Sequence, residues 1–451
     1  MTSSDSSPAR LRARLAEVDE EMDALESKLQ LLASERRRVV DGLNAIVYPV
    51  ITLPPEITSG IFSHYVHNPQ LGHTRAPASG HGPLILASVC RNWRNICLST
   101  GSLWASLQIY PNPSWDVDDF VHLLERWLER ARNHPLNLRV FGCGPDTIMP
   151  MRIFSVLSHH SHKLRFQGQL PLLTKLVVSF IIQGDRPVMM TAFENAPLLR
   201  EARLSGASLH WISLPWFQLT HLEFYDESVS SCLQVLNETP NLEVLDVFLS
   251  GLDTGPLPVS CLTLFHLHTL KFAYDPEGRL LDLLILPRLQ AIQLNALRGD
   301  EGTARFLALG ARSAWSLRSI CLDDMTIRSC IVCLRSVPSV TVVEIRAWDD
   351  HLSDELFRPL RDDPTFLPAL RALTLRDCES EIFASCLAEM LESRSSFGDQ
   401  GRRGKLESCI LFFSPQVSRN LRPSVEKVRT RLRPLVDAGL EIFIGSPSDL
   451  R

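Results

Sequence analysis

The sequence predicts an α/β fold in three parts: a long N-terminal coiled-coil helix, a small all-α module, and an irregular solenoid of parallel strands and helices. Three observations support this. Apolar residues alternate at spacings of four and three over residues 11–46. Residues 49–108 contain a proline pair followed by short apolar helical stripes. From about residue 170 onward one short apolar pattern returns repeatedly, which is typical of a stacked repeat array.

The composition excludes several classes of protein. The chain has 451 residues, of which 45% are hydrophobic, and a formal net charge of −5. A nucleic-acid-binding protein would show a basic excess or stripe, which is missing here. The start "MTSSDSSPAR" lacks the layout of a secretory signal, and no apolar run reaches the ~18 residues of a membrane span. The 11 cysteines are scattered and odd in number, so we expect a reduced protein of the cytoplasm, the nucleus or both.

Residues 10–48 are predicted to form the coiled-coil helix, after a disordered segment at residues 1–9. A spacing of 3.5 residues keeps one apolar stripe facing a partner helix. Only Arg36 interrupts the stripe. Its members are Leu11, Leu15, Val18, Met22, Leu25, Leu29, Leu32, Arg36, Val39, Leu43 and Ile46.

The sequence does not decide what this helix packs against. Residues 17–26 are acidic and residues 36–38 are basic, so a parallel pair would place acid beside acid. An antiparallel pair of two copies, centred near Leu29, would set acid against base and would make the chain a homodimer. The alternative is a single helix packed on the rest of the chain.

Residues 49–108 carry an ordered set of motifs. The stretch "TLPPEITSGIF" (52–62) places prolines in the first turn of a helix, where a missing N–H costs nothing. Residues 66–83 are rich in Pro, Gly, Asn and His and are predicted to be a loop. Residues 84–98 are predicted to form a second helix, and "GSLWASL" (101–107) a turn with a last short apolar element.

This order of motifs resembles an F-box. The resemblance rests on Leu53-Pro54-Pro55-Glu56-Ile57, Ile61-Phe62, Val89-Cys90-Arg91-Asn92-Trp93-Arg94 and Leu103-Trp104. The loop at 66–83 is longer than the few residues usual between the first helices. With the coiled-coil helix in front, the chain is similar to a large fungal group of F-box proteins.

The resemblance implies a helical module that docks on a Skp-type adaptor, which joins a cullin–RING ubiquitin ligase. A motif of about 50 residues cannot bury so many apolar side chains internally, and an open apolar patch marks an interaction site. The alternative is that these residues form the core of a cap for the solenoid. The adaptor-binding candidates are Leu53, Pro54, Pro55, Ile57, Ile61, Phe62, Val89, Cys90, Trp93, Leu103 and Trp104.

Residues 109–451 contain ten units in which apolar residues stand at the first, fourth and sixth positions. Most units begin 20 to 28 residues apart, and they resemble degenerate leucine-rich repeats. The resemblance implies parallel strands on a concave face and helices on a convex face. Residues 105–165 would cap the front, and a helix, Gly439 and a last strand would cap the end. The units begin at Leu173, Leu199, Leu219, Leu242, Leu267, Leu289, Leu317, Val340, Leu370 and Leu406.

One position per strand is expected to point to solvent at the centre of the concave face. The series is Val177, Arg203, Glu223, Asp246, Lys271, Gln293, Cys321, Glu344, Thr374 and Ile410. Solenoids commonly bind partners on this face, so its polar members are candidates for binding a protein target: Arg203, Glu223, Asp246, Lys271, Gln293 and Glu344. The alternative is a ladder of charges that satisfy one another, with Arg203 beside Glu223 and Asp246 beside Lys271.

No catalytic, metal or cofactor motif stands out. Cys330 and Cys333 form one C-x-x-C without the second pair that a zinc site needs, and are expected on the buried face of a helix. The histidines of residues 67–81 and 159–162 are expected to be solvated. We therefore predict no cofactor and no metal. The F-box resemblance implies a non-enzymatic substrate-recognition adaptor of a Skp–cullin–F-box ubiquitin ligase. The rival is a scaffold without ligase function, in which the coiled coil drives assembly and the repeats bind a ligand.

Overall fold

The structure is a computed structural model that describes residues 8–45, 53–67, 82–109, 117–141, 172–179, 193–205, 212–226, 228–249, 260–273, 278–297, 299–346, 352–378, 383–395, 406–413 and 422–445. These residues belong to two compact units. The helical unit comprises the described residues up to Thr100, and the repeat unit begins at Gly101.

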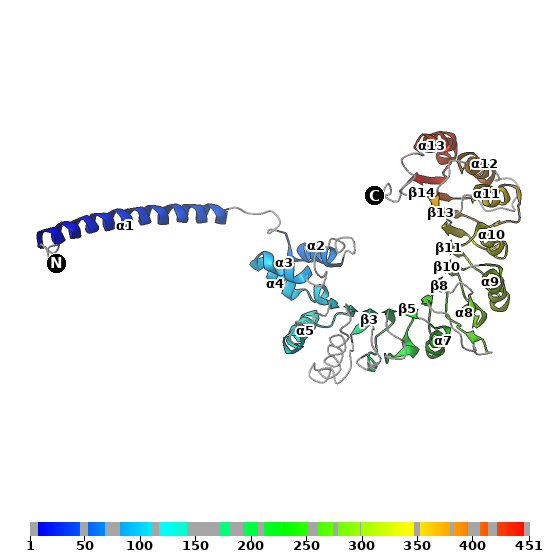
Figure 1. Cartoon of the computed structure of the whole chain (residues 1–451), viewed down its shortest axis with the longest axis horizontal. Coiled ribbons are helices and arrows are strands. Elements are labelled where there is room, and N and C mark those ends of the chain that lie inside the picture. Colours follow the sequence, from blue (N-terminus) through cyan, green and yellow to red (C-terminus); the bar gives the residue numbers. More distant parts are fainter. Residues whose placement is uncertain are drawn as a thin grey trace, which may run out of the picture. The chain divides into compact units, whose positions relative to one another are not determined.

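The helical unit begins with α1, Pro8–Ala45, one continuous helix (Figure 1). Its bounds agree with the predicted coiled coil, of which residues 46–48 lie outside the described residues, as do residues 1–7. Every side chain described in α1, from residue 8 to residue 43, is exposed. Within the helical unit, α1 is therefore not packed on the described residues of α2 to α4. Among the described residues, no helix is both long and apolar enough to cross a bilayer.

Three short helices follow: α2 (Pro55–His67), α3 (Gly82–Val89) and α4 (Arg91–Ser99). Pro55 opens α2 as expected, and the first-turn amide of Thr58 donates to the Pro54 carbonyl at 3.0 Å. The predicted loop at 66–83 is wrong at both ends, because its first two and last two residues are helical. The residues between them, 68–81, lie outside the described part.

The single helix predicted over 84–98 is wrong, because the chain breaks at Cys90. This residue is extended (φ −154°, ψ 170°), and its Sγ accepts a hydrogen bond from the amide of Trp93 at 3.4 Å. Cys90 thus caps the N-terminus of α4, a role that a side-chain acceptor can fill by satisfying an otherwise unpaired amide. The apolar periodicity continues across the break, so the sequence pattern alone does not reveal it.

The repeat unit is built on a thirteen-stranded, all-parallel sheet with helices along its convex side (Figure 1). Its strand order is β1-β2-β3-β4-β5-β6-β8-β10-β11-β12-β13-β14-β15. The strands are β1 (Ser106–Ile109), β2 (Leu136–Phe141), β3 (Leu173–Ser179), β4 (Glu201–Ser205), β5 (His221–Asp226), β6 (Val244–Leu249), β8 (Thr269–Ala273), β10 (Ala291–Asn295), β11 (Ser319–Asp323), β12 (Val342–Arg346), β13 (Ala372–Cys378), β14 (Ser408–Phe413) and β15 (Glu441–Gly445). The short strands β7 (Leu262–Thr263) and β9 (Leu284–Ile285), which the sequence pattern does not predict, pair separately.

The helices among the described residues of this unit are η4 (Gly101–Trp104), α5 (Val117–Ala131), η6 (Trp216–Gln218), α7 (Val229–Glu238), α8 (Arg279–Asp282), α9 (Gly299–Ser313), α10 (Ile327–Arg335), α11 (Leu352–Asp362), α12 (Phe383–Ser395) and α13 (Arg422–Asp437). All ten predicted units contain a strand of the main sheet. The leucine-rich-repeat-like solenoid that the apolar pattern predicts is therefore the fold of this part of the chain.

Alternation along each strand explains the core. In β8, Leu270 and Phe272 point inward and are buried, while Lys271 between them faces outward. Neighbouring strands repeat this arrangement in register, so each unit buries its apolar side chains against the next unit. The stack is closed at its C-terminal end as predicted: α13 ends near Gly439, whose φ of +96° favours glycine, and β15 follows.

A buried arginine joins three elements near the C-terminal end. Arg394 of α12 is 2% exposed and donates to the carbonyls of Leu360, Phe366 and Leu367 at 2.7–2.9 Å. These carbonyls lie at the end of α11 and in the turn that follows it. The guanidinium therefore satisfies acceptors that the helix end would otherwise leave unpaired.

Candidate protein-interaction surfaces

The helical module α2–α4 has a small core of its own. Phe62 of α2 is 2% exposed and packs edge-on against Trp93 of α4, with ring centroids 4.8 Å apart. Leu86, Ile96 and Cys97 are also buried. Because these side chains fill the interior, the apolar residues on the other faces of the helices remain in water.

Those other faces carry two exposed apolar stripes. On α2, Ile57 and Ile61 are 54% and 51% exposed, and Tyr65 follows four residues later. On α3, Ile85 and Val89 are 52% and 58% exposed. Spacings of four residues place the members of each stripe on one side of their helix. The stripes consist of Ile57, Ile61, Tyr65, Ile85 and Val89, and we call them the open apolar stripes.

In the structure, the predicted adaptor-binding residues are of three kinds: exposed, half-buried and buried. Ile57, Ile61 and Val89 lie in the open apolar stripes, and Pro54 and Pro55 are exposed at the start of α2. Leu53, Cys90 and Trp93 are half-buried. The sequence pattern missed Ile85 as a candidate, although its spacing of four from Val89 was a usable signal.

The expectation that Phe62, Leu103 and Trp104 lie open is wrong. Phe62 belongs to the module core, and Leu103 and Trp104 are fully buried in the repeat unit. The Trp104 ring meets Trp127 edge-on at 4.8 Å and the Arg130 guanidinium at 4.6 Å. Its carbonyl also accepts a hydrogen bond from Trp127 Nε1 at 2.7 Å. The Leu-Trp pair thus anchors α5 as part of the N-terminal cap of the solenoid.

On the concave face, the strand register aligns the predicted central series, although Val177 is buried and the expectation that it points to solvent is wrong. Each of its ten members, from Val177 to Ile410, is the direct Cα partner of the next. The series extends through Arg139 and Gln108 at one end and Phe443 at the other. The apolar pattern fixes this register because a slip of one residue would turn every leucine outward.

Charges on this face are paired with each other. Arg203 forms an ion pair with Glu223, and Lys271 Nζ lies 3.6 Å from Asp246 Oδ2. These are the two pairs that the self-satisfied ladder required. Further along, Glu344 pairs with Arg376. A partner that bound here would therefore have to replace or bridge existing ion pairs.

Burial perturbs the acidic centre of this ladder. Desolvation raises the pKa of Glu223 above its usual value, which Arg203 opposes and Asp246 reinforces. The neighbouring Tyr225 also has a raised pKa, mainly because of desolvation and then because of the Glu223 and Asp246 carboxylates. Tyr225 lies against Phe248, with ring centroids 4.9 Å apart. This part of the face therefore combines two carboxylates with an aromatic pair.

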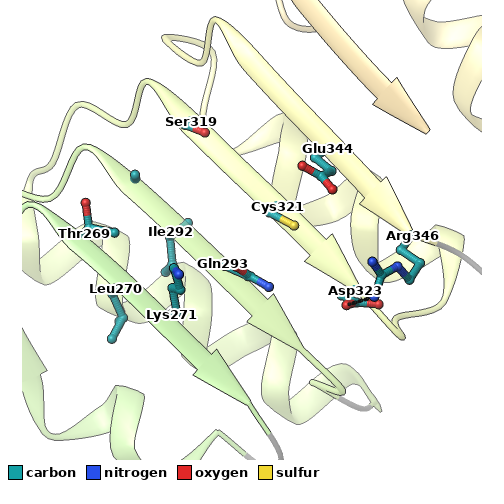
Figure 2. Close-up of a pocket in the computed structure, with 11 residues that line it drawn as sticks. Thr269, Leu270, Lys271, Ile292, Gln293, Ser319, Cys321, Asp323, Glu344 and Arg346 are labelled. Carbon is teal, nitrogen blue, oxygen red and sulfur yellow. Dashed lines mark hydrogen bonds and ion pairs between the residues drawn. The ribbon is translucent and has the colours of Figure 1, made fainter. Parts of the chain in front are cut away.

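A hollow of about 270 Å³ lies between β8 and β12. Its lining includes a row of short side chains, because Thr269, Ala291 and Ser319 are aligned across three neighbouring strands. Figure 2 shows the longer side chains that surround it. They are Lys271, Gln293, Asp323, Glu344 and Arg346. A hollow of this size suits a side chain of a partner better than a cofactor, since ligand pockets are usually larger.

One wall of the hollow is an ion pair that the central series does not contain. Arg346 donates to the Asp323 carboxylate at 3.0 Å, and the Asn295 amide donates to the same oxygen at 3.2 Å. Asp323 is nearly buried. These residues stand two positions after the central ones, which is the next outward position of each strand. The alternation that predicts the central series could have found them.

The thiols of Cys321, Cys330 and Cys333 are expected to be weak nucleophiles, because burial raises their pKa values. Burial raises the pKa of Cys321 to about 12, and the Glu344 and Asp323 carboxylates reinforce this shift. Cys330 and Cys333 lie on the buried side of α10 as predicted, and burial raises the pKa of each to about 12. Within the described residues, no cluster of three or more His, Cys, Asp or Glu could hold a metal ion.

The sequence matches no protein family model, and no curated protein matches it either.

Proposed function

We propose that this chain is a non-catalytic recognition subunit of a Skp–cullin–F-box type ubiquitin ligase. In this proposal the module α2–α4 binds a Skp-type adaptor, and the solenoid binds a protein that becomes the ubiquitin target. The observation that carries the proposal is the pair of open apolar stripes on α2 and α3. They belong to the same motifs that resemble an F-box.

The stripes support adaptor docking for a physical reason. Four of their members are aliphatic side chains that remain more than half exposed, although the module has a filled core. Covering aliphatic surface with a partner is favourable by about 25 cal/mol per Å² removed from water. Leu53 and Trp93, which are half-buried, would contribute the edge of the same contact. In the proposal, function follows from bringing ligase and target together rather than from chemistry on this chain.

Surface substitutions test the adaptor contact. We expect Ile57→Asp and Val89→Asp each to weaken adaptor binding about 30-fold or more, because each would bury an unpaired carboxylate in an apolar interface. Val332→Asp, on the exposed face of α10 in the solenoid, is the matched control and should bind normally. Binding is measured by titrating a purified Skp-type adaptor into the full-length chain. A wild-type chain that binds no adaptor would favour the scaffold function instead.

Target binding is proposed for the concave face around the hollow. Ala291 lines the hollow, whereas Ala372 lies in the same row outside it. We expect Ala291→Arg to fill the hollow and to reduce recovery of the target at least tenfold. Ala372→Arg adds the same side chain and should have little effect. Recovery is measured by affinity purification with mass spectrometry while the proteasome is inhibited, and equal loss with both variants would contradict this location.

A further inference from the structure

The long helix α1 exposes an apolar stripe that nothing in the described part of the chain covers. Its members are 36% to 70% exposed in a helix of 38 residues. They occupy the first and fourth positions (a and d) of successive heptads, with Leu15, Met22, Leu29, Arg36 and Leu43 at a. The remaining described members, at d, are Leu11, Val18, Leu25, Leu32 and Val39. Such a stripe requires a partner helix.

The charges beside the stripe disfavour a parallel pair of identical helices. In that arrangement Arg36 would face its own copy in the centre of the interface. Glu21, at a g position, would face Glu26 of the partner at an e position. Like charges at these positions destabilise a coiled coil, and they select against the arrangement that creates them.

We propose that α1 pairs with α1 of a second copy of this chain in antiparallel orientation. In this register the residue numbers of each facing pair of core positions, one at a and one at d, add up to 61, and those of facing g positions add up to 63. Val18 then faces Leu43, and Leu29 faces Leu32. Arg36 faces Leu25, within one turn of the partner's acidic residues 20–26. Lys28 and Glu35, both at g positions, face each other across the interface twice.

Neighbouring antiparallel registers are less favourable. A shift of one heptad to a sum of 54 places Lys28 against Lys28 and Glu21 against Glu35. A further shift, to a sum of 47, places Arg36 opposite Leu11, among Arg10, Arg12 and Arg14. Only the sum of 61 brings the basic residues 36–38 beside the acidic segment without like charges at the e and g positions. Charge complementarity therefore selects both the orientation and the register.

Paired cysteines test the orientation in the full-length chain. In Val18→Cys/Leu43→Cys, the antiparallel pair brings residue 18 of one copy to residue 43 of the other. Within one helix these positions are about 37 Å apart, too far to bond. We expect brief oxidation to give a disulfide between peptides 18 and 43 in a species of twice the chain mass. Disulfides joining 18 to 18 and 43 to 43, or a chain that remains monomeric, would overturn the proposal.

Charge exchange tests the register. We expect Lys28→Glu and Glu35→Lys each to weaken dimerisation on the order of tenfold, because each converts two attractive contacts to repulsive ones. The double variant should restore the wild-type dissociation constant. Asp41→Lys, at an outward f position, is the matched control and should not change it. Dissociation constants are measured by sedimentation velocity, and a double variant as weak as the singles would exclude this register.

The variants lie in α1, whereas the adaptor test uses α2 and α3, so either proposal can fail alone. In the proposed dimer the two Ala45 residues lie about 44 Å apart, toward opposite ends of the paired helices. A parallel dimer would place them side by side.

Discussion

The helical module and the solenoid treat their apolar residues in opposite ways. In the solenoid, alternate strand residues such as Ile320 and Leu322 are buried, and charged residues at the outward positions of β4, β5, β6 and β8 pair across the sheet. In the module, isoleucines of the same size, such as Ile57 and Ile61, remain in water. The strands of the solenoid thus bury their inward apolar residues against neighbouring repeats, whereas the module leaves two aliphatic stripes that a second protein would cover.

The largest expected effect comes from replacing an isoleucine by alanine in each of the two regions and comparing the losses of stability. Ile320→Ala in β11 should lower the free energy of unfolding by about 2–5 kcal/mol, because it leaves a cavity in a packed core. Ile57→Ala in α2 removes an exposed side chain and should change it by no more than about 0.5 kcal/mol. Urea denaturation measures both. Equal losses would mean that Ile57 is part of a core, and the contrast would then be lost.

A second test compares ion pairs within the solenoid. Arg346→Met takes the guanidinium from Asp323, whose side chain is only 8% exposed, and should cost about 1–3 kcal/mol. Arg371→Met breaks a pair with Glu407 in which both side chains are at least 60% exposed, and should cost less than about 0.5 kcal/mol. Urea denaturation of the two variants measures both losses of stability. A negligible effect of Arg346→Met would show that the wall of the hollow is not a structural ion pair.

Thiol labelling gives a smaller effect that leaves the fold intact. With a pKa of about 12, Cys321 is a thiolate in about one molecule in ten thousand at pH 8. Cys261 is exposed. We therefore expect iodoacetamide to modify Cys261 well before Cys321, as followed by mass spectrometry of the native protein. Rapid labelling of Cys321 would indicate that the concave face opens readily, unlike a packed solenoid.

The smallest expected effect is a pH dependence from Glu223. Because its pKa is raised in the folded chain, the folded state holds this proton more tightly than the unfolded state. Its contribution favours folding most at pH values below the unfolded pKa and declines as the pH rises through the folded pKa. Relative to Glu223→Gln, the wild type should therefore lose stability as the pH rises above the ordinary pKa of a glutamate, about 4.3. Urea midpoints of both proteins below and above this pH check the sign.

The sequence predicts the solenoid well because one physical requirement repeats. Burying two apolar residues per strand fixes the face of every strand, and hence the register from Val177 to Ile410. The module is harder to predict, because similar apolar spacings serve a core, as at Phe62, and an open face, as at Ile61. Burial at Trp104 depends on Trp127 and Arg130, and the break at Cys90 depends on one capping bond. The burial of Trp104 depends on tertiary contacts and the helix break on a single hydrogen bond, and neither can be predicted from the spacing of apolar residues.

The balanced ladder on the concave face has a kinetic consequence. Outward positions of β3 to β13 carry five basic and five acidic side chains: Lys175, Arg203, Lys271, Arg346 and Arg376 with Glu201, Glu223, Asp246, Asp323 and Glu344. Such a face projects little long-range field. A protein that meets it would arrive by undirected diffusion, at about 10⁵–10⁶ M⁻¹s⁻¹, and would do so at nearly the same rate in dilute and in concentrated salt.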